Sequence, residues 1–523
     1  MKRTLPLLLL ILPLLPLTAQ VTLISDYTPG PEGSFENPFE VRTQQNAELG
    51  DNEGTIIVAN KGTGQAILLL ADGQLEELAT YDDNIGLLTP FGNEVYYTAE
   101  DSITGPALYA TDGTVAGTRL VVDPDTTTTT GAIVDYKITP AGVIYIGYRD
   151  RLYRYENGTN RLLTDNADLG SAFDNEPGSS LTLHEDGVAY YNSSDFRDGG
   201  GLYLATDTIQ FLAVVPEQSR FGNAFGLRSL RGNLVFSLAS TRVEREGTYQ
   251  YNTTTQTLNR LTDGAGNPLY ATRYFNFNDS TAVGLVDNST YYLLDGSGTA
   301  TAIQSVGRFS TTARVALPAV PTQDDRLAFL SGGGFGGNTE LYLTDGTPDG
   351  TTRLASTTTV SNPLVANGHL YFATQRFRNE QHTINRYNLE TGGLVQLVEL
   401  PNVARDNVQL LTVQGDQLYF TYTLDEATGK ELYALPTGVI NSVYASRLSV
   451  IPLDIHTTAN TFLINQPSTQ PATLTVYDLN GRIIHGARKI PTQTAFPYLP
   501  GCGLHIYHFA LNGRVAVRKI VRQ

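Results

Sequence analysis

The chain contains almost no cysteine, tryptophan or methionine. Its 523 residues include a single cysteine, Cys502, so no disulfide can form within the chain. Tryptophan is absent, and 29 tyrosines and 20 phenylalanines supply the aromatic bulk instead. Because larger chains bury a larger fraction of their surface, a chain of this length can be stable through its hydrophobic core alone.

Basic residues are also scarce. There are 35 lysines and arginines against 52 acidic residues, which gives a formal net charge of -17. Nucleic acids are bound through basic surfaces that contact their phosphates, so the composition argues against a nucleic-acid partner. An acidic surface also keeps copies of the chain apart in solution.

Long apolar runs are missing after the N-terminus. There, Lys2 and Arg3 precede an apolar run from Leu5 to Leu17, and small or polar residues follow. This order is typical of a secretory signal peptide, which we expect to span residues 1–19 with cleavage after Ala19. The run is shorter than the ~20 residues of a membrane-spanning helix, although a retained anchor is the alternative. We expect no transmembrane segment elsewhere.

The sequence does contain a repeated phrase rich in tyrosine and threonine. It reads LYATDGTVAGTRL at Leu108–Leu120 and ELYLTDGTPDGTTRL at Glu340–Leu354, with weaker copies at 201–207, 291–296 and 431–435. Repetition at a fixed period indicates one supersecondary unit stacked many times. Short alternating apolar runs bounded by Gly, Asn and Asp are frequent, and helical periodicity is almost absent, which predicts an all-β fold.

The spacing of turn glycines indicates the size of the repeated unit. They recur in steps of 45–50 residues, a period typical of propeller blades, at Gly92, Gly142, Gly187 and Gly232 and again at Gly368 and Gly415. The gap of 136 residues between Gly232 and Gly368 equals three such steps, so two further units lie between them. Four-stranded units of this length stack radially in β-propellers. Counting second strands gives nine units, so we predict a β-propeller of eight or nine four-stranded blades over residues 20–447. An open stack and two smaller rings are the alternatives.

The two ends of this region are predicted to meet. Residues 21–26 resemble a fourth strand with no unit before it, so we expect them to complete the last blade and remove an exposed strand edge. The repeated tyrosines are expected to pack between blades. Asp-Gly steps supply tight hairpin turns, and Gly117 and Gly350 are expected to let the chain reverse into the fourth strand.

The repeated phrase resembles a known family. ELYLTDGTPDGTTRL is similar to the ELWxTDGTxxGT repeat of secreted, mostly bacterial propeller-like proteins, with Tyr where that family usually has Trp. The resemblance covers two units well and the others loosely. It implies the propeller architecture and says almost nothing about activity.

The pattern changes near the C-terminus, where short strands and turns predict a small C-terminal β-sandwich over residues 448–523. This module resembles the type A sorting domain of the type IX secretion system of Bacteroidota, whose pattern runs VYDxxGR, LPxGxY and a strand with a Lys-containing tail. The matching residues are Val476, Tyr477, Asp478, Gly481, Arg482, Leu499, Pro500, Gly501 and Lys519.

This second resemblance implies a destination. A type A sorting domain directs transport across the outer membrane by the type IX secretion machinery, followed by removal of the module and release or surface attachment. The expected localisation is therefore secreted or on the outer cell surface. An ordinary terminal β-domain is the alternative, and the usual Pro-Asn-Pro opening is missing; Val450–Leu453 stand near its place.

Catalytic patterns are hard to find. His505 and His508 lie three apart in a predicted strand and face opposite sides, and His184 lacks the second histidine of a helical zinc site. No GxSxG, Walker or dinucleotide motif occurs. Glycosidases need paired carboxylates, but the pairs Asp82-Asp83, Glu185-Asp186 and Asp324-Asp325 are interpreted more simply as turn residues. We predict no catalytic residues and no cofactor.

Calcium is the one ion for which the sequence offers ligands. Asp345, Asp349 and the carbonyls between them are hard oxygen donors, although their spacing differs from an EF-hand loop. A turn whose carboxylates are satisfied within the protein is the competing interpretation.

These patterns predict a secreted or cell-surface, non-catalytic protein that binds a glycan or a protein. One alternative is a polysaccharide-active hydrolase or lyase that uses the central face of the propeller. The other is a structural component of a surface layer.

Overall fold

A computed structural model of the chain shows only strands, turns and irregular segments in its described residues. The structure describes residues 21–25, 27, 34–35, 46–50, 54–126, 131–165, 167, 180–192, 200–215, 224–238, 246–278, 280–286, 290–305, 319–321, 326–332, 339–357, 359–360, 363–375, 381–401, 408–425, 429–438, 455–457, 461–464, 472–477, 483–490, 496–497, 503–511 and 514–522.

Nine antiparallel sheets follow one another along the chain, and each is one blade. Blades 1 to 3 contain β2 (Asn46–Glu48), β3 (Thr55–Lys61), β4 (Gly64–Ala71) and β5 (Gln74–Tyr81); β6 (Gly86–Phe91), β7 (Glu94–Asp101), β8 (Gly105–Thr111) and β9 (Arg119–Val122); and β10 (Ile133–Ile138), β11 (Ile144–Tyr148), β12 (Arg151–Glu156) and β13 (Thr159–Thr164).

The middle three blades have the same order of strands. Blades 4 to 6 contain β14 (Leu181–His184), β15 (Gly187–Asn192), β16 (Gly201–Ala205) and β17 (Ile209–Val214); β18 (Ala224–Leu230), β19 (Asn233–Leu238), β20 (Gly247–Asn252) and β21 (Thr257–Arg260); and β22 (Ala271–Asn278), β23 (Thr281–Val286), β24 (Thr290–Leu294) and β25 (Ala300–Ser305).

The last three blades include two variations: the first strand of blade 8 is split in two, and one strand of blade 9 comes from the N-terminus. They contain β26 (Ala319–Pro321), β27 (Leu327–Gly332), β28 (Thr339–Thr344) and β29 (Thr352–Thr357); β30 (Thr359–Val360), β31 (Leu364–Ala366), β32 (His369–Gln375), β33 (His382–Asn388) and β34 (Leu394–Leu400); and β35 (Gln409–Gln414), β36 (Gln417–Asp425), β37 (Gly429–Pro436) and β1 (Thr22–Ser25).

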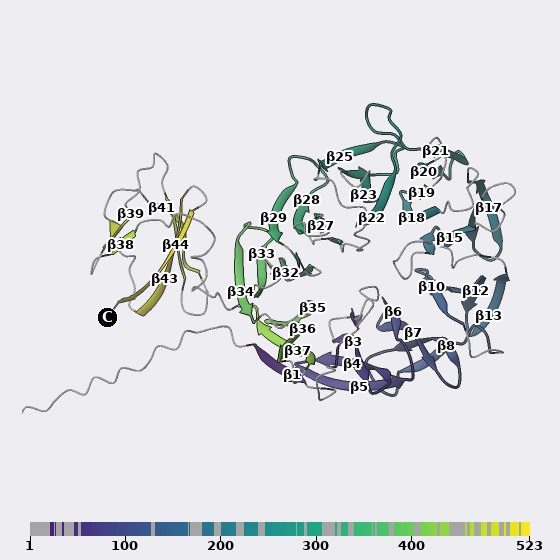
Figure 1. The fold of residues 1–523 in the computed structure, drawn as a ribbon, viewed down its shortest axis with the longest axis horizontal. Coiled ribbons are helices and arrows are strands. Elements are labelled where there is room, and N and C mark those ends of the chain that lie inside the picture. The colour runs from purple at the N-terminus through teal and green to yellow at the C-terminus, as the bar shows by residue number, and fades with distance from the viewer. Residues whose placement is uncertain are drawn as a thin grey trace, which may run out of the picture. The chain divides into compact units, whose positions relative to one another are not determined.

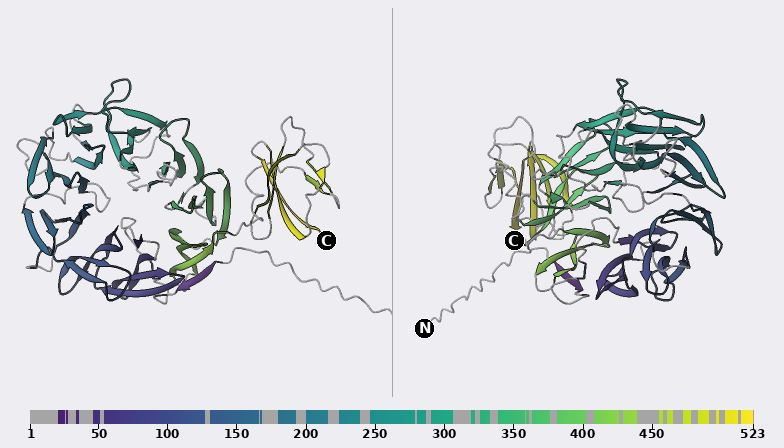
Figure 2. Two further views of the ribbon diagram at one scale, coloured as in Figure 1. Left: turned by 180° about the vertical axis from the view of Figure 1, so that it is seen from behind. Right: turned by 45° about the vertical axis from the view of Figure 1, so that its right-hand side comes forward.

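The nine sheets form a ring, so the protein has a β-propeller with nine blades (Figure 1). The first strands lie toward the middle of the ring and the fourth strands at its outside (Figure 1), and the view from behind shows the same ring (Figure 2). First strands of neighbouring blades contact one another, for example β2 with β6, β10 with β14, and β22 with β26. The predicted fold class is therefore confirmed, with the larger of the two predicted blade numbers.

The hydrophobic core lies between blades. One cluster joins Ile56 and Ile67 of blade 1 to Val95, Tyr97 and Tyr109 of blade 2. The same arrangement recurs around the ring, where each cluster draws its side chains from two consecutive blades. The repeated unit buries its apolar faces only when a neighbour is present, which explains why the unit is repeated.

The repeated tyrosines pack in these clusters, as predicted. Tyr97 is fully buried, and its ring stacks on Tyr109 with centroids 5.9 Å apart. Its hydroxyl is 2.7 Å from that of Tyr81 in blade 1, so a buried polar atom is satisfied across the boundary between two blades. Equivalent stacked pairs are Tyr190 with Tyr203, Phe236 with Tyr249, Phe329 with Tyr342, and Phe420 with Tyr433.

A β-bulge recurs in the fourth strand. In blade 2, Leu108 pairs with Val122 and Tyr109 with Leu120, so Val121 is an extra residue. The extra residues of six blades are all aliphatic, and all join the cluster shared with the next blade. They are Leu78, Val121, Leu163, Leu212, Ile303 and Leu354.

The N-terminal strand closes the ring, as predicted. β1 is the outermost strand of blade 9, next to β37. A second contact adds to this closure, because the buried carboxylate of Glu431 accepts hydrogen bonds from the backbone N–H (2.8 Å) and the hydroxyl (2.6 Å) of Ser34. Asn60 of blade 1 donates its N–H to the Ser34 carbonyl at 2.7 Å, so one short segment links the last blade to the first.

One turn assignment was wrong. Gly187 begins β15, and the turn before it consists of Glu185 and Asp186, with Glu185 at a φ of 50°. The other turn glycines at 92, 142, 232, 368 and 415 do have positive φ. A two-residue hairpin needs this conformation, and glycine adopts it most easily.

The chain divides into two compact units, one of residues 23–393 and 400–434, and another that includes residues 435–523. The C-terminal part contains two sheets, with the orders β38-β39-β42 and β41-β40-β43-β44. Their strands are β38 (Ile455–Thr457), β39 (Thr461–Ile464), β42 (Phe496–Pro497), β41 (Ile483–Ile490), β40 (Ala472–Tyr477), β43 (Gly503–Leu511) and β44 (Arg514–Arg522). No helix among the described residues is long and apolar enough to cross a membrane.

Candidate functional site

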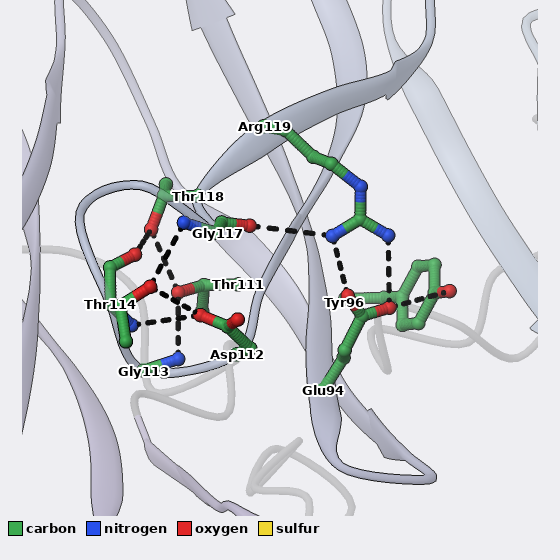
Figure 3. A network of polar contacts seen from close by, with 9 residues as sticks. All are labelled: Glu94, Tyr96, Thr111, Asp112, Gly113, Thr114, Gly117, Thr118 and Arg119. Atoms are coloured by element: carbon green, nitrogen blue, oxygen red, sulfur yellow. Dashed lines mark hydrogen bonds and ion pairs between the residues drawn. The ribbon is translucent and has the colours of Figure 1, made fainter.

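The repeated phrase forms a turn whose polar groups bond to one another (Figure 3). In the connection between β8 and β9, Asp112 Oδ1 accepts hydrogen bonds from the Thr114 hydroxyl (2.7 Å) and N–H (3.0 Å). Gly117 donates its N–H to the Thr114 hydroxyl at 2.9 Å, and the Thr111 and Thr118 hydroxyls are 2.8 Å apart. These hydrogen bonds from Thr114 hold the pKa of Asp112 below its usual range.

The second full copy has the same network. Asp345 Oδ1 accepts hydrogen bonds from the Thr347 hydroxyl (2.7 Å) and N–H (2.9 Å), and Gly350 donates to the Thr347 hydroxyl at 3.0 Å. The Thr344 and Thr351 hydroxyls are 2.6 Å apart. The turns in blades 2 and 7 therefore contain the same hydrogen bonds. This shared turn explains why the same phrase occurs in both blades.

The glycines of this turn have two different roles. Gly113 has a φ of 87°, and a Cβ there would lie 2.6 Å from Leu49 in the preceding blade. Gly117 has no positive φ, but a Cβ would lie 2.0 Å from Asp112 Oδ1. Gly350 has the same relation to Asp345. The second glycine is therefore needed because a side chain at its position would clash with the aspartate carboxylate. The predicted role, reversal of the chain into the fourth strand, was incomplete.

The two predicted calcium ligands lie in this turn. Asp345 and Asp349 are both exposed, and Asp345 Oδ1 is engaged by Thr347. Within the described residues, no group of three or more His, Cys, Asp or Glu is placed to hold a metal ion. Calcium binding at Asp345 and Asp349 stays a prediction.

The acidic pairs proposed for catalysis lie in separate turns. Asp82 accepts a hydrogen bond from the Ser102 N–H at 3.0 Å, and Asp83 from the Asn84 N–H at 2.8 Å. Glu185 and Asp186 form the hairpin between β14 and β15. Asp324 and Asp325 lie outside the described residues. The structure does not bring the two described acidic pairs together.

The polar groups that do gather lie on the first strands of blades 3 to 5. Asp135 on β10 is 1% exposed, and its carboxylate contacts Lys137 Nζ at 2.7 Å and the Leu181 N–H of β14 at 2.7 Å. Burial raises the pKa of Asp135, against the opposing charge of Lys137. Sequence reasoning missed this group, because Asp135 and Leu181 are joined only by the stacking of two blades.

The next boundary carries a similar pair of contacts. Thr182 on β14 donates to the Leu227 carbonyl of β18 at 2.8 Å, and His184 Nδ1 is 2.8 Å from the Ser229 hydroxyl. Together with Asp135, these residues form a row of polar contacts that fastens three consecutive blades near the middle of the ring. We call this row the axial contacts.

Comparison with known proteins identifies no family for this chain. No protein-family model and no curated protein matches the chain. A puromycin-hydrolyzing peptidase of Mycobacterium tuberculosis is 13% identical, with a TM-score of 0.40 over 75% of this chain and 60% of that chain. Dipeptidyl peptidase 4 of Porphyromonas gingivalis is 11% identical, with a TM-score of 0.38 over 74% and 59%.

A eukaryotic initiation factor is 12% identical, with a TM-score of 0.43 over 72% of this chain and 92% of that chain. The chain spans 54% to 61% of the length of three of the matching peptidases. At these TM-scores the likenesses carry no argument about this chain.

The residues predicted from the two export signals are not tested by the structure. Ala19, Asp478, Gly481, Arg482, Leu499, Pro500 and Gly501 lie outside the described residues. Val476 and Tyr477 belong to β40, and Lys519 belongs to β44. Their role in sorting stays a prediction.

Proposed function

We propose that this protein is a secreted or cell-surface binding protein, delivered by the type IX secretion system, whose propeller binds a glycan or a protein. The observation that carries the proposal is where the described candidates for catalysis and metal binding lie. Asp82, Asp83 and Asp345 accept hydrogen bonds in turns, and His184 contacts Ser229 between blades. These groups are used to build the ring.

The export part of the proposal depends on the two ends of the sequence. A basic and apolar N-terminal segment precedes the ring, and a VYDLNGR motif follows it. The absence of disulfides fits such a protein, because the clusters between blades stabilise the ring without them.

We place the ligand on the face where one blade connects to the next. Two-residue hairpins lie at the opposite face, as at Gly92–Asn93 and Arg231–Gly232, whereas the fully described connections between blades include the short segment 82–85 and the longer segment 261–270. In repeat proteins, insertions collect on one face, which is often the binding face. Within the connection 261–270, the side chain of Asp263 accepts hydrogen bonds from the N–H groups of Ala265 and Asn267.

A binding screen tests the proposal. The purified chain without residues 1–19 is applied to a glycan array and to a panel of polysaccharides, and product release is followed in parallel. We expect saturable binding to one class of glycan, or to a surface protein in a matched pull-down, with no turnover. Sustained product release would replace the binding function with hydrolase or lyase activity, and the absence of any ligand would favour a structural surface-layer component.

A further inference from the structure

His184 is the most unusual ionisable residue of the axial contacts. It ends β14, the first strand of blade 4, and its side chain is directed to β18 of blade 5. The residue is 2% exposed, and Nδ1 lies 2.8 Å from the Ser229 hydroxyl. One hydrogen bond of a titratable ring therefore joins two blades.

The other ring nitrogen has no hydrogen-bond partner among the described residues. His184 Nε2 is buried and makes no hydrogen bond in the described structure. A neutral imidazole carries one N–H, but an imidazolium carries two, and Nε2 then becomes a charged donor without an acceptor. Burying an uncompensated charge is costly, so the observed contact is suited to the neutral ring alone.

Few groups around His184 could compensate a positive charge on its ring. Burial lowers the pKa of His184, and the only opposing contribution comes from the charge of Glu185 in the following turn. On β18, Arg228 adds positive charge, and Arg231 in the following turn contacts Asp295 at 3.9 Å. On β10, Asp135 is already paired with Lys137. The adjacent strands β15 and β19 carry no charged residue.

His369 shows the contrasting arrangement. Its Nδ1 lies 2.7 Å from the Asn367 carbonyl oxygen, and its Nε2 lies 3.2 Å from Asn388 Nδ2. Both of its ring nitrogens therefore have polar partners. His369 lies on β32 of blade 8 and serves as a matched control for a histidine within the same ring.

We propose that the contact between His184 and Ser229 is an acid-sensitive joint of the propeller, closed when the imidazole is neutral and loosened when the ring takes up a proton from solvent, so that both of its nitrogens become donors. Loosening separates β14 from β18 and weakens the ring between blades 4 and 5. A proton is the only ligand that this joint requires.

The direction of the pH dependence follows from the burial of His184. The pKa of His184 in the folded chain lies below the value of 6.5 that an exposed histidine has. Above pH 6.5 the ring is neutral in both states, and the contact contributes fully. As the pH falls below 6.5, the unfolded or opened state binds the proton first, so stability is lost until the pH passes below the folded pKa.

Hydrogen exchange of the full chain at pH 7.5 and pH 5.0, corrected for the intrinsic pH dependence, tests the joint. We expect protection of residues 181–184 and 226–230 to fall about tenfold on acidification for each unit by which the pKa is lowered. Strands β22 and β26 report another boundary between blades and should change less. H184Q should abolish the acid-induced change, whereas H369Q should retain it.

The same acid-induced change in H184Q and in the wild-type chain would overturn the proposal. An independent measurement is the titration of the histidine rings of the wild-type chain by NMR, which requires no variant to fold. A pKa for His184 below 6.5 supports the joint, and a pKa at or above 6.5 contradicts it.

Discussion

Replacing Glu431 by alanine is expected to lower the free energy of unfolding by about 3 kcal/mol. The carboxylate accepts two hydrogen bonds from Ser34, and both residues are fully buried. A hydrogen bond to a charged group contributes ~1.5–3 kcal/mol, and removing one partner leaves the other unsatisfied. Because Ser34 also binds Asn60 of blade 1, the loss weakens the closure of the whole ring.

Denaturant unfolding of the purified chain measures this effect. Ser34→Ala removes only the hydroxyl and should cost about half as much, and the double variant should cost less than the sum, because both changes remove the same bond. Glu76→Ala, on the exposed face of β5, is the control and should stay within about 0.5 kcal/mol of wild type. A similarly small effect of E431A would show that Ser34 does not hold the ring closed.

Replacing Tyr97 by alanine is expected to cost about 4 kcal/mol, in the range of large-to-small aromatic substitutions in a core. The side chain is fully buried between blades 1 and 2, where it contacts Tyr81 and Tyr109. Tyr97→Phe keeps the ring and removes only the hydroxyl contact with Tyr81, so it should cost about 1 kcal/mol.

Unfolding of Y97A, Y97F and the double variant Y81F/Y97F separates packing from hydrogen bonding. The two hydroxyl deletions should not add, because they remove one shared contact. Equal costs for Y97A and Y97F would contradict the assignment of Tyr97 to a packed boundary between blades.

The architecture could be predicted from the sequence because the repeated phrase indicates it directly. Phrases such as ELYLTDGT mark the third strand of a blade and its following turn, and their spacing predicted a propeller. The strand at 21–26 could be assigned to the last blade because it had no unit of its own. The number of blades stayed between eight and nine, since the units around 281–286 and 327–332 keep the strands but lack the turn glycine before their second strands.

Other features depend on distances in space. The bulge in the fourth strand has a weak signature, namely two adjacent apolar residues such as Leu120-Val121 or Leu162-Leu163 where alternation is expected. The sequence suggests that Gly117 is needed for its backbone conformation, but in the structure it is needed because its backbone lies close to a carboxylate. Ser34 and Glu431 are 397 positions apart, and no local pattern connects them.

The candidate site was predicted least well. Charged or titratable residues such as Asp135 and His184 are indistinguishable in sequence from surface residues, because the neighbours that bury them belong to other blades. The turn positions predicted for the carboxylates are confirmed for Asp82, Asp83 and Asp345. No sequence pattern predicts that polar contacts near the middle of the ring link blades 3 to 5.

Hydrogen exchange of the peptide that contains β1 tests the central claim, which is a nine-bladed ring closed by its own N-terminal strand. In the wild-type chain without residues 1–19, we expect the amides of residues 22–25 that face β37 to exchange far more slowly than those of an unstructured peptide, because β1 pairs with β37 (residues 429–436) in one sheet. Exchange of residues 22–25 at the rate of an unstructured peptide, while β37 remains protected, would contradict the closed ring.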